Sequence, residues 1–286
     1  MSNISASQVK ELREKTGLGL MDCKKALEEA NGDIDLAIEE LRKSSGLKAS
    51  KKSSRSAADG LIGIKSSEGK AFMVEINCET DFVARDDSFN LFMIEVLETV
   101  SSNRNKSLEE LLEEGIEEKR EKLVQKLGEN IVVRRIAGSE DSADFLGVYL
   151  HSNNKIGAIV SLKGGTEEIA KDIAMHAAAT DPMAILPSDI PQEVVEKERE
   201  IYKAQSDESG KPEDIVEKMI EGKIRKFLSD VSLTEQGFVK DPSIKINDLL
   251  KDNNASIVGF TRFEVGEGIE VEKVDFASEV MSQIEG

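Results

Sequence analysis

The chain has 286 residues, with 56 aspartates and glutamates against 38 lysines and arginines, which gives a formal net charge of −18. A field of this sign repels phosphate backbones, so we expect a protein partner and no direct contact with nucleic acid. No apolar run is long enough to span a bilayer, and residues 1–4 lead into a polar helix without a signal-peptide pattern, so we expect a cytoplasmic protein away from the membrane.

Residues 1–44 are predicted to form a three-helix domain with one small core. Ser5 and Gln8 have the spacing of a capping box at the start of the first helix. Cys23 and Leu27 lie on one face of the second helix, and Asp33 is placed to cap the third. The compact size and the Gly-Leu-Gly turn at residues 17–19 resemble a ubiquitin-associated domain.

Residues 45–57 are interpreted as a basic, serine-rich linker. They show no apolar periodicity and carry Lys48, Lys51, Lys52 and Arg55. A solvated tether explains this composition, and contact of the four basic side chains with RNA or the ribosome is the alternative.

One pattern then occurs twice. Core unit 1, residues 58–140, has predicted strands at 61–65 and 71–78, a helix with an apolar stripe over 89–100, and a delayed strand at 131–137. Core unit 2, residues 141–186 and 230–266, repeats it with strands at 145–151 and 156–162, a helix at 167–179 and a late strand at 256–265. Each copy indicates a three-stranded antiparallel sheet backed by helices, so the predicted fold class is α+β.

Helical insertions delay the third strand of each copy. In the first copy, Ser107 and Glu110 form a capping box before an apolar series that ends at Leu127. In the second, residues 187–229 form a predicted helical hairpin whose first arm is poor in apolar residues, so we expect it to project into solvent, where it could mediate self-association. Residues 267–286 are predicted to form a C-terminal helical module with Phe276, Val280 and Ile284 at helical spacing; it either docks on the body or is held out for a partner.

Few residues of the chain could carry catalysis or bind a metal. Cys23 and Cys78 lie far apart without metal-ligand spacing, so we expect reduced, packed thiols. His176 is interpreted as a packed helix residue, whereas His151 ends a strand at a turn, where both a structural and a binding role are open. No nucleophile elbow, phosphate-binding loop or zinc-protease helix is present. We therefore expect neither an enzyme nor a cofactor, and a hydrolase would need an activity that depends on these histidines.

The most unusual segment is residues 75–89, where a strand ends and a helix begins with a predicted cap at Asp87 or Ser88. Asp81 stands directly beside the large aromatic Phe82. In one interpretation Phe82 packs into the local core and Asp81 caps a turn. In the other, the pair forms an exposed wedge on a rigid mount.

Residues 80–86, with Phe89 following, resemble a signature of the elongation factor Ts family. Residues 12–27 with 31–33, and residues 262–270, resemble further family motifs, and residues 173–176 and 231–236 also look like the family. These matches follow the family order over nearly the whole chain. Leu20 stands where methionine is more usual.

The resemblance implies a guanine-nucleotide exchange factor for the translational GTPase EF-Tu. Such a factor binds EF-Tu in its GDP-bound and nucleotide-free states, displaces Mg²⁺ and promotes GDP release during translation elongation. It implies that Thr80, Asp81, Phe82 and Val83 enter the partner beside its switch region. It also suggests partner contacts at Met21 and Lys24 in the N-terminal helices, and at Leu127 and His151 in the core units.

Overall fold

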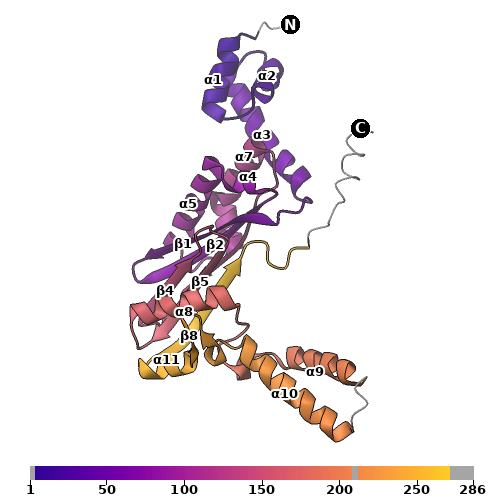
Figure 1. The fold of residues 1–286 in the computed structure, drawn as a ribbon. Helices are drawn as coiled ribbons and strands as arrows, with labels where there is room; N and C mark the ends of the chain where they lie inside the picture. The colour runs from indigo at the N-terminus through magenta and orange to yellow at the C-terminus, as the bar shows by residue number, and fades with distance from the viewer. Residues whose placement is uncertain (1–3, 208–211, 271–286) are drawn as a thin grey trace. The chain divides into compact units, whose positions relative to one another are not determined.

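The computed structural model describes residues 4–207 and 212–270, so the predicted helix around Phe276, Val280 and Ile284 lies outside the described residues. The chain divides into two compact units (Figure 1). Unit 1 contains the described residues up to Gly63, Val74–Ile136 and the described residues from Glu264 onward, and unit 2 contains Ile64–Met73 and Ala137–Phe263. Helices combine with two antiparallel three-stranded sheets, which confirms the α+β class.

Unit 1 begins with three helices around a small core. The predicted capping box is present, because the Ser5 hydroxyl accepts from the Gln8 backbone N–H at 3.3 Å while the Gln8 side chain accepts from the Ser5 N–H at 3.0 Å. Leu12, Cys23 and Leu27 are fully buried and fill the space between the helices. The helices are α1 (Ala6–Thr16), α2 (Leu20–Glu29) and α3 (Ile34–Lys52).

The interpretation of residues 45–52 as linker was wrong, because α3 continues through them to Lys52. This part of α3 packs against α7 (Glu117–Leu127), and the small side chains of Ser45 and Ala49 are buried there. Serine and alanine produce no apolar stripe in the sequence, yet small residues let two helices approach closely. The contact with α7 therefore stabilises a helix that local composition does not predict.

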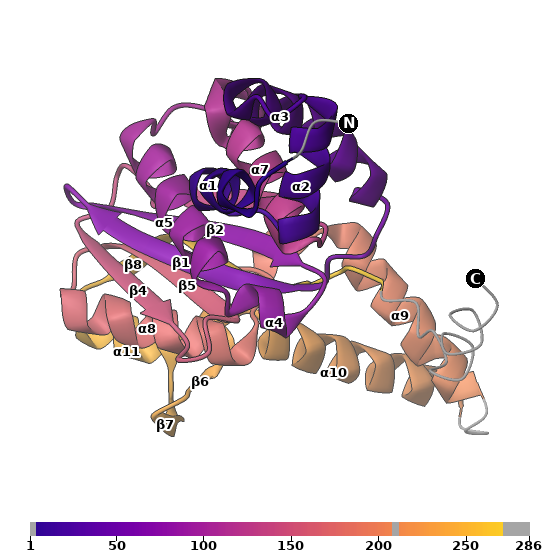
Figure 2. The same ribbon diagram turned by 90° about the horizontal axis from the view of Figure 1, so that it is seen from above.

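The first sheet of the chain has the order β1-β2-β3 and is covered by α5. Figure 2 shows α5 crossing β1 and β2, and Gly63 on β1 makes the approach possible, since a Cβ there would lie 2.6 Å from the Met93 sulfur. The predicted stripe of α5, from Phe89 to Val100, is buried as expected. The cap of α5 is Asp86, not Asp87 or Ser88, and its carboxylate accepts from the Ser88 N–H at 2.7 Å. The elements are β1 (Asp59–Ser67), β2 (Lys70–Cys78), α4 (Asp81–Ala84), α5 (Asp87–Ser102), α6 (Leu108–Leu111) and β3 (Val132–Gly138).

Unit 2 is built on the sheet β4-β5-β8, with α8 and α11 packed along it. Strands β4 and β5 pair antiparallel from Phe145 opposite Leu162 to Leu150 opposite Gly157. Figures 1 and 2 show α8 and α11 side by side along the sheet, and Ile173 of α8 and Ile246 of α11 belong to the same buried core. The elements are β4 (Phe145–Leu150), β5 (Ile156–Lys163), α8 (Glu167–Thr180), α11 (Ile246–Asp252) and β8 (Ser256–Glu264).

The predicted helical hairpin is formed by α9 (Gln192–Asp207) and α10 (Glu213–Val231), which pack on each other and extend away from the sheet of unit 2 (Figure 1). Ile220 and Ile224 are buried at the root of α10, whereas no described side chain of α9 is fully buried. The small sheet of β6 (Gly237–Phe238) and β7 (Asp241–Lys245) was not predicted. Across residues 4–207 and 212–270, no helix combines the length and apolar character that a membrane span needs.

Candidate functional site

Residues 80–83, here called the tip, form a short turn of helix directly after β2. Thr80 caps α4, and its hydroxyl accepts from the Val83 N–H at 3.5 Å. Val83 is buried and anchors the turn, whereas Phe82 is 81% exposed. The interpretation that packs Phe82 into the local core was therefore wrong, and the tip presents an aromatic ring to solvent. The Asp81 carboxylate pairs with Arg85 at 2.7 Å, so Thr80 and not Asp81 provides the cap.

The tip is held from behind by a residue that the sequence did not single out. Glu129 follows α7, and its carboxylate accepts hydrogen bonds from the backbone N–H groups of Glu79 at 3.1 Å and Thr80 at 3.0 Å. No motif marks Glu129, because its partners are backbone groups about 50 positions earlier. Leu127 is a half-buried residue at the end of α7. It lies close to this support because it precedes Glu129 by only two positions.

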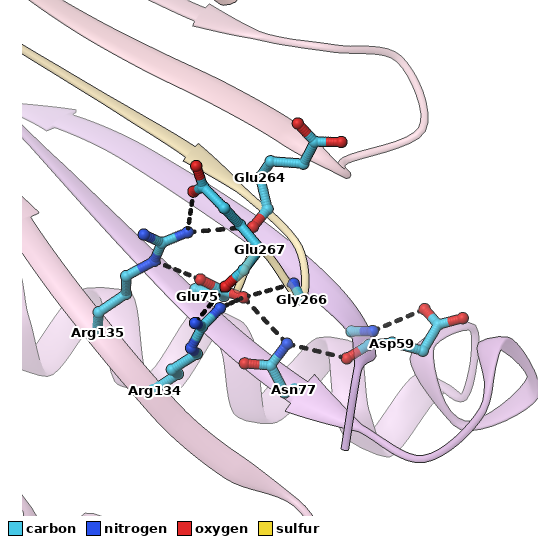
Figure 3. A network of polar contacts seen from close by, with 9 residues as sticks. Asp59, Glu75, Asn77, Arg134, Arg135, Glu264, Gly266 and Glu267 are labelled. Carbon is cyan, nitrogen blue, oxygen red and sulfur yellow. Dashed lines mark hydrogen bonds and ion pairs between the residues drawn. The ribbon is translucent and has the colours of Figure 1, made fainter. Parts of the chain in front are cut away.

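The strand that carries the tip is anchored by a buried carboxylate (Figure 3). Glu75 of β2 is fully buried and accepts from Arg134 at 3.1 Å, Arg135 at 2.5 Å and the Gly266 N–H at 2.9 Å. Burial alone would raise the pKa of Glu75, but the hydrogen bonds from Gly266, Asn77 and Arg135 outweigh it and lower the pKa. The network ties β2, β3 and the turn after β8 together. Its only signal in the sequence is an acid inside an apolar strand.

The remaining sequence-predicted contacts lie on other elements. Met21 on α2 is 71% exposed, and Lys24 is exposed one turn further along. Asp22 between them binds Lys48 of α3 at 2.9 Å, which fixes α2 against α3. Met21 and Lys24 belong to unit 1 together with the tip and Leu127, whereas His151 belongs to unit 2.

The two histidines differ in environment. His151 is exposed, and its Nδ1 lies 3.0 Å from the Tyr149 hydroxyl. His176 is fully buried, which confirms the packed role predicted for it. The Val239 backbone N–H donates to His176 Nδ1 at 3.1 Å, so Nε2 carries the proton and donates to the Gln236 side-chain oxygen at 3.0 Å. Burial lowers the pKa of His176. With both ring nitrogens occupied, this histidine is not available as a general base.

Three of the four basic side chains of the predicted linker contact other groups of the chain. Lys52 donates to the Gly128 carbonyl, and Arg55 lies 3.5 Å from the Glu79 carboxylate. Lys48 also forms an ion pair with Asp22, so each of these three basic side chains has a partner within the protein. The arrangement gives no support to the RNA-binding alternative.

Further exposed apolar residues follow the tip on α5. Leu91 and Ile94 are exposed three positions apart on the outer face of this helix. They lie outside the predicted apolar stripe, because α5 carries apolar residues on more than its core-facing side. Both cysteines are buried and neither forms a disulfide, and within the described ranges no cluster of histidine, cysteine or acidic residues could hold a metal.

Comparison with known proteins identifies the family. A family model described as Elongation factor TS matches residues 79–267, a range that includes the tip and Glu129. The chain is 55% identical over 288 residues to elongation factor Ts of Hahella chejuensis, with all of both chains covered. It is 56% identical over 282 residues to elongation factor Ts of Marinobacter nauticus, with 98% of this chain and 97% of the relative covered. It is 53% identical over 292 residues to elongation factor Ts of Francisella tularensis subsp. novicida, again with all of both chains covered. The resemblance seen in residues 80–86 is thereby confirmed, and the chain belongs to the elongation factor Ts family.

Proposed function

We propose that this protein is a guanine-nucleotide exchange factor for EF-Tu, and that its Asp81–Phe82 turn displaces Mg²⁺ and promotes GDP release. The observation that carries the proposal is the mounting of Phe82. The ring is 81% exposed, while Val83 beside it is buried and the preceding backbone is bonded to Glu129. An exposed aromatic on a fixed backbone is suited to fill a pocket in a partner at low entropic cost.

The chemistry of a GTPase explains why such a wedge would release nucleotide. Mg²⁺ is held by few protein ligands together with the nucleotide phosphates, so the shift of one neighbouring element exposes it. Loss of Mg²⁺ leaves the phosphate charge without its counter-ion and weakens GDP binding. Factor and nucleotide then oppose each other through one reciprocal coupling free energy. A ten-thousand-fold weakening requires about 5.5 kcal/mol of contacts made only in the nucleotide-poor state.

Three exposed residues and the half-buried Leu127 supply candidate contacts that hold the partner. Met21 and Lys24 on α2, Leu127 at the end of α7 and His151 after β4 are proposed to contact EF-Tu, in its GDP-bound and nucleotide-free forms. We place the protein in the cytoplasm, where translation takes place. Self-association through the α9–α10 hairpin stays a prediction.

The test is release of a fluorescent GDP analogue from EF-Tu at fixed Mg²⁺ with substoichiometric amounts of this protein. The wild-type chain should accelerate release with multiple turnovers. Phe82→Ala and Asp81→Ala should slow exchange more than they weaken binding to EF-Tu, because the contact of the tip matters most as Mg²⁺ leaves. Equal losses in exchange and binding would contradict this role.

Two controls sharpen the result. Leu47→Ala removes an exposed apolar side chain from α3 and should leave exchange unchanged. Addition of EDTA removes Mg²⁺ by another route, so the deficit of Phe82→Ala should shrink when the chelator is present. A deficit that stays the same with EDTA would show that Phe82 acts on the nucleotide by some means other than Mg²⁺ displacement.

A further inference from the structure

The segment after α7 reaches the base of the tip through a left-handed turn. Gly128 has φ 81°, a conformation that glycine adopts without strain, and it redirects the chain toward the end of β2. Glu129 then accepts from the Glu79 N–H at 3.1 Å, the Thr80 N–H at 3.0 Å and the Thr80 hydroxyl at 2.6 Å. One carboxylate therefore satisfies the donors that β2 leaves unpaired at its end.

The support is reciprocal. The carboxylate of Glu79 accepts from the Asn130 backbone N–H at 2.6 Å, while Glu129 accepts from the backbone of Glu79. Each acidic residue thus binds the main chain of the segment that carries the other. Two bonds of opposite direction between two short segments resist both sliding and rotation of one against the other. Arg55 lies 3.5 Å from the Glu79 carboxylate and offsets part of the negative charge.

This arrangement determines where Phe82 stands. Thr80 is both the cap of α4 and the residue that Glu129 binds through its backbone and its hydroxyl. Rotation of the Glu79–Thr80 turn would carry α4, and with it Phe82, to a new direction. Small misplacement of a positioning element is costly in catalysis, because orientation must otherwise be recovered from binding free energy.

We propose that Glu129 is a positioning residue for nucleotide exchange, which holds the Glu79–Thr80 turn so that Phe82 has the orientation that exchange requires. The proposal rests on the proposed function of the tip and adds to it a residue that acts through Phe82.

The test compares Glu129→Ala and Glu129→Gln in the GDP-release assay with EF-Tu. Glu129→Ala should slow exchange at least about tenfold with little change in affinity for EF-Tu. Glu129→Gln should retain most of the activity, because its amide oxygen can accept from both backbone N–H groups and its NH₂ can donate to the Thr80 hydroxyl. An alanine variant with full activity, or a glutamine variant as impaired as alanine, would overturn the proposal.

A double variant separates positioning from general damage. If Glu129 acts through Phe82, Glu129→Ala should cause no further loss of exchange when combined with Phe82→Ala. Multiplied losses would overturn the positioning role. Glu113→Ala removes the same charge from an exposed site of unit 1 and should match wild type.

Hydrogen exchange of the Glu79 and Thr80 amides gives a readout that needs no EF-Tu. Both amides should exchange faster in Glu129→Ala and remain protected in Glu129→Gln, while thermal unfolding shows whether each variant is folded. Unchanged protection in the alanine variant would overturn the proposal. If the wild-type chain does not accelerate GDP release, the exchange function itself is overturned, a result distinct from normal wild-type exchange with an unaffected Glu129→Ala.

Discussion

Phe82 and Phe89 stand seven residues apart and have opposite environments. Phe82 is 81% exposed on the tip, whereas Phe89 lies on the buried side of α5 and is 0% exposed. The buried ring anchors the first turn of the helix that follows the tip. The position of the exposed Phe82 ring is therefore set by the segments before and after it, because the ring itself makes little packing contact.

The two phenylalanines should separate stability from exchange. Phe89→Ala leaves a cavity in the core of unit 1 and should cost about 3–5 kcal/mol of unfolding free energy. Phe82→Ala removes an exposed ring and should change stability by less than about 0.5 kcal/mol. Urea unfolding of both variants measures this. A large loss in Phe82→Ala would mean that the ring packs on the body in solution.

Replacement of the buried Glu75 should destabilise the protein in a pH-dependent way. Glu75→Gln leaves Arg134 and Arg135 without their buried counter-charge and should cost about 2–4 kcal/mol at pH 7. Because the pKa of Glu75 is lowered in the folded state, its contribution is present above its ordinary pKa of 4.5 and is lost as pH falls through the folded value. We therefore expect the difference in unfolding free energy between wild type and Glu75→Gln to be smaller at pH 4 than at pH 7, as measured by chemical unfolding.

Glu267→Gln is the matched control for this prediction. Its carboxylate binds Arg135 at 3.0 Å but is partly exposed, so the loss should stay below about 1 kcal/mol. Similar losses in the two variants would mean that burial does not set the strength of the Glu75 network.

His176 should make unit 2 less stable in mild acid. Its pKa is lowered from 6.5 in the folded state, so the unfolded chain binds the proton first and stability falls as pH drops below about 6.5, by up to about 1.4 kcal/mol per pH unit. The fall stops once the pH passes the folded pKa. Unfolding of wild type and His176→Gln at pH 7.5 and 5.5 isolates the effect, since other groups titrate in both. Equal pH dependence of the two proteins would contradict it.

Two glycine substitutions should have opposite effects. A Cβ at Gly147 on β4 would lie 1.8 Å from the Ala170 carbonyl oxygen, so Gly147→Ala must push α8 off the sheet and should cost about 3 kcal/mol or more. Gly222 lies inside α10 with open space around its Cβ position, so Gly222→Ala should stabilise by about 0.5–1 kcal/mol. Thermal unfolding should show a lower stability for Gly147→Ala and a higher stability for Gly222→Ala. A Gly147→Ala variant with unchanged stability would refute the close approach of β4 and α8.

Patterns local to one segment predicted the elements well. The capping boxes at Ser5 and Ser107 are present, and the repeated order of strands and helices forms the two sheets. These features depend on hydrogen bonds three residues apart or on periodic burial, which the sequence displays directly.

Features that depend on distant partners were not predictable in the same way. The helix over residues 45–52 is stabilised by α7, and Glu129 and Glu75 bind groups far away in the chain. Glu129 is of a residue type that is ordinary at solvent-facing positions, and the position of Glu75 inside an apolar strand does not reveal which groups it binds. The exposure of Phe82 was one of two open interpretations for the same reason, because burial of a turn residue is decided by its neighbours in space.

Because α3 continues along α7, the distance between the proposed contact surfaces on α2 and on the tip is set by packed helices and not by a flexible linker. A flexible tether between α2 and the tip would make the second contact an intramolecular event, with an effective concentration that depends on the length of the tether. Here Lys52 binds the Gly128 carbonyl, next to the residue that supports the tip. The spacing between the two surfaces is then a property of packed helices, and shortening or lengthening residues 53–57 should alter avidity far less than breaking the contact between α3 and α7.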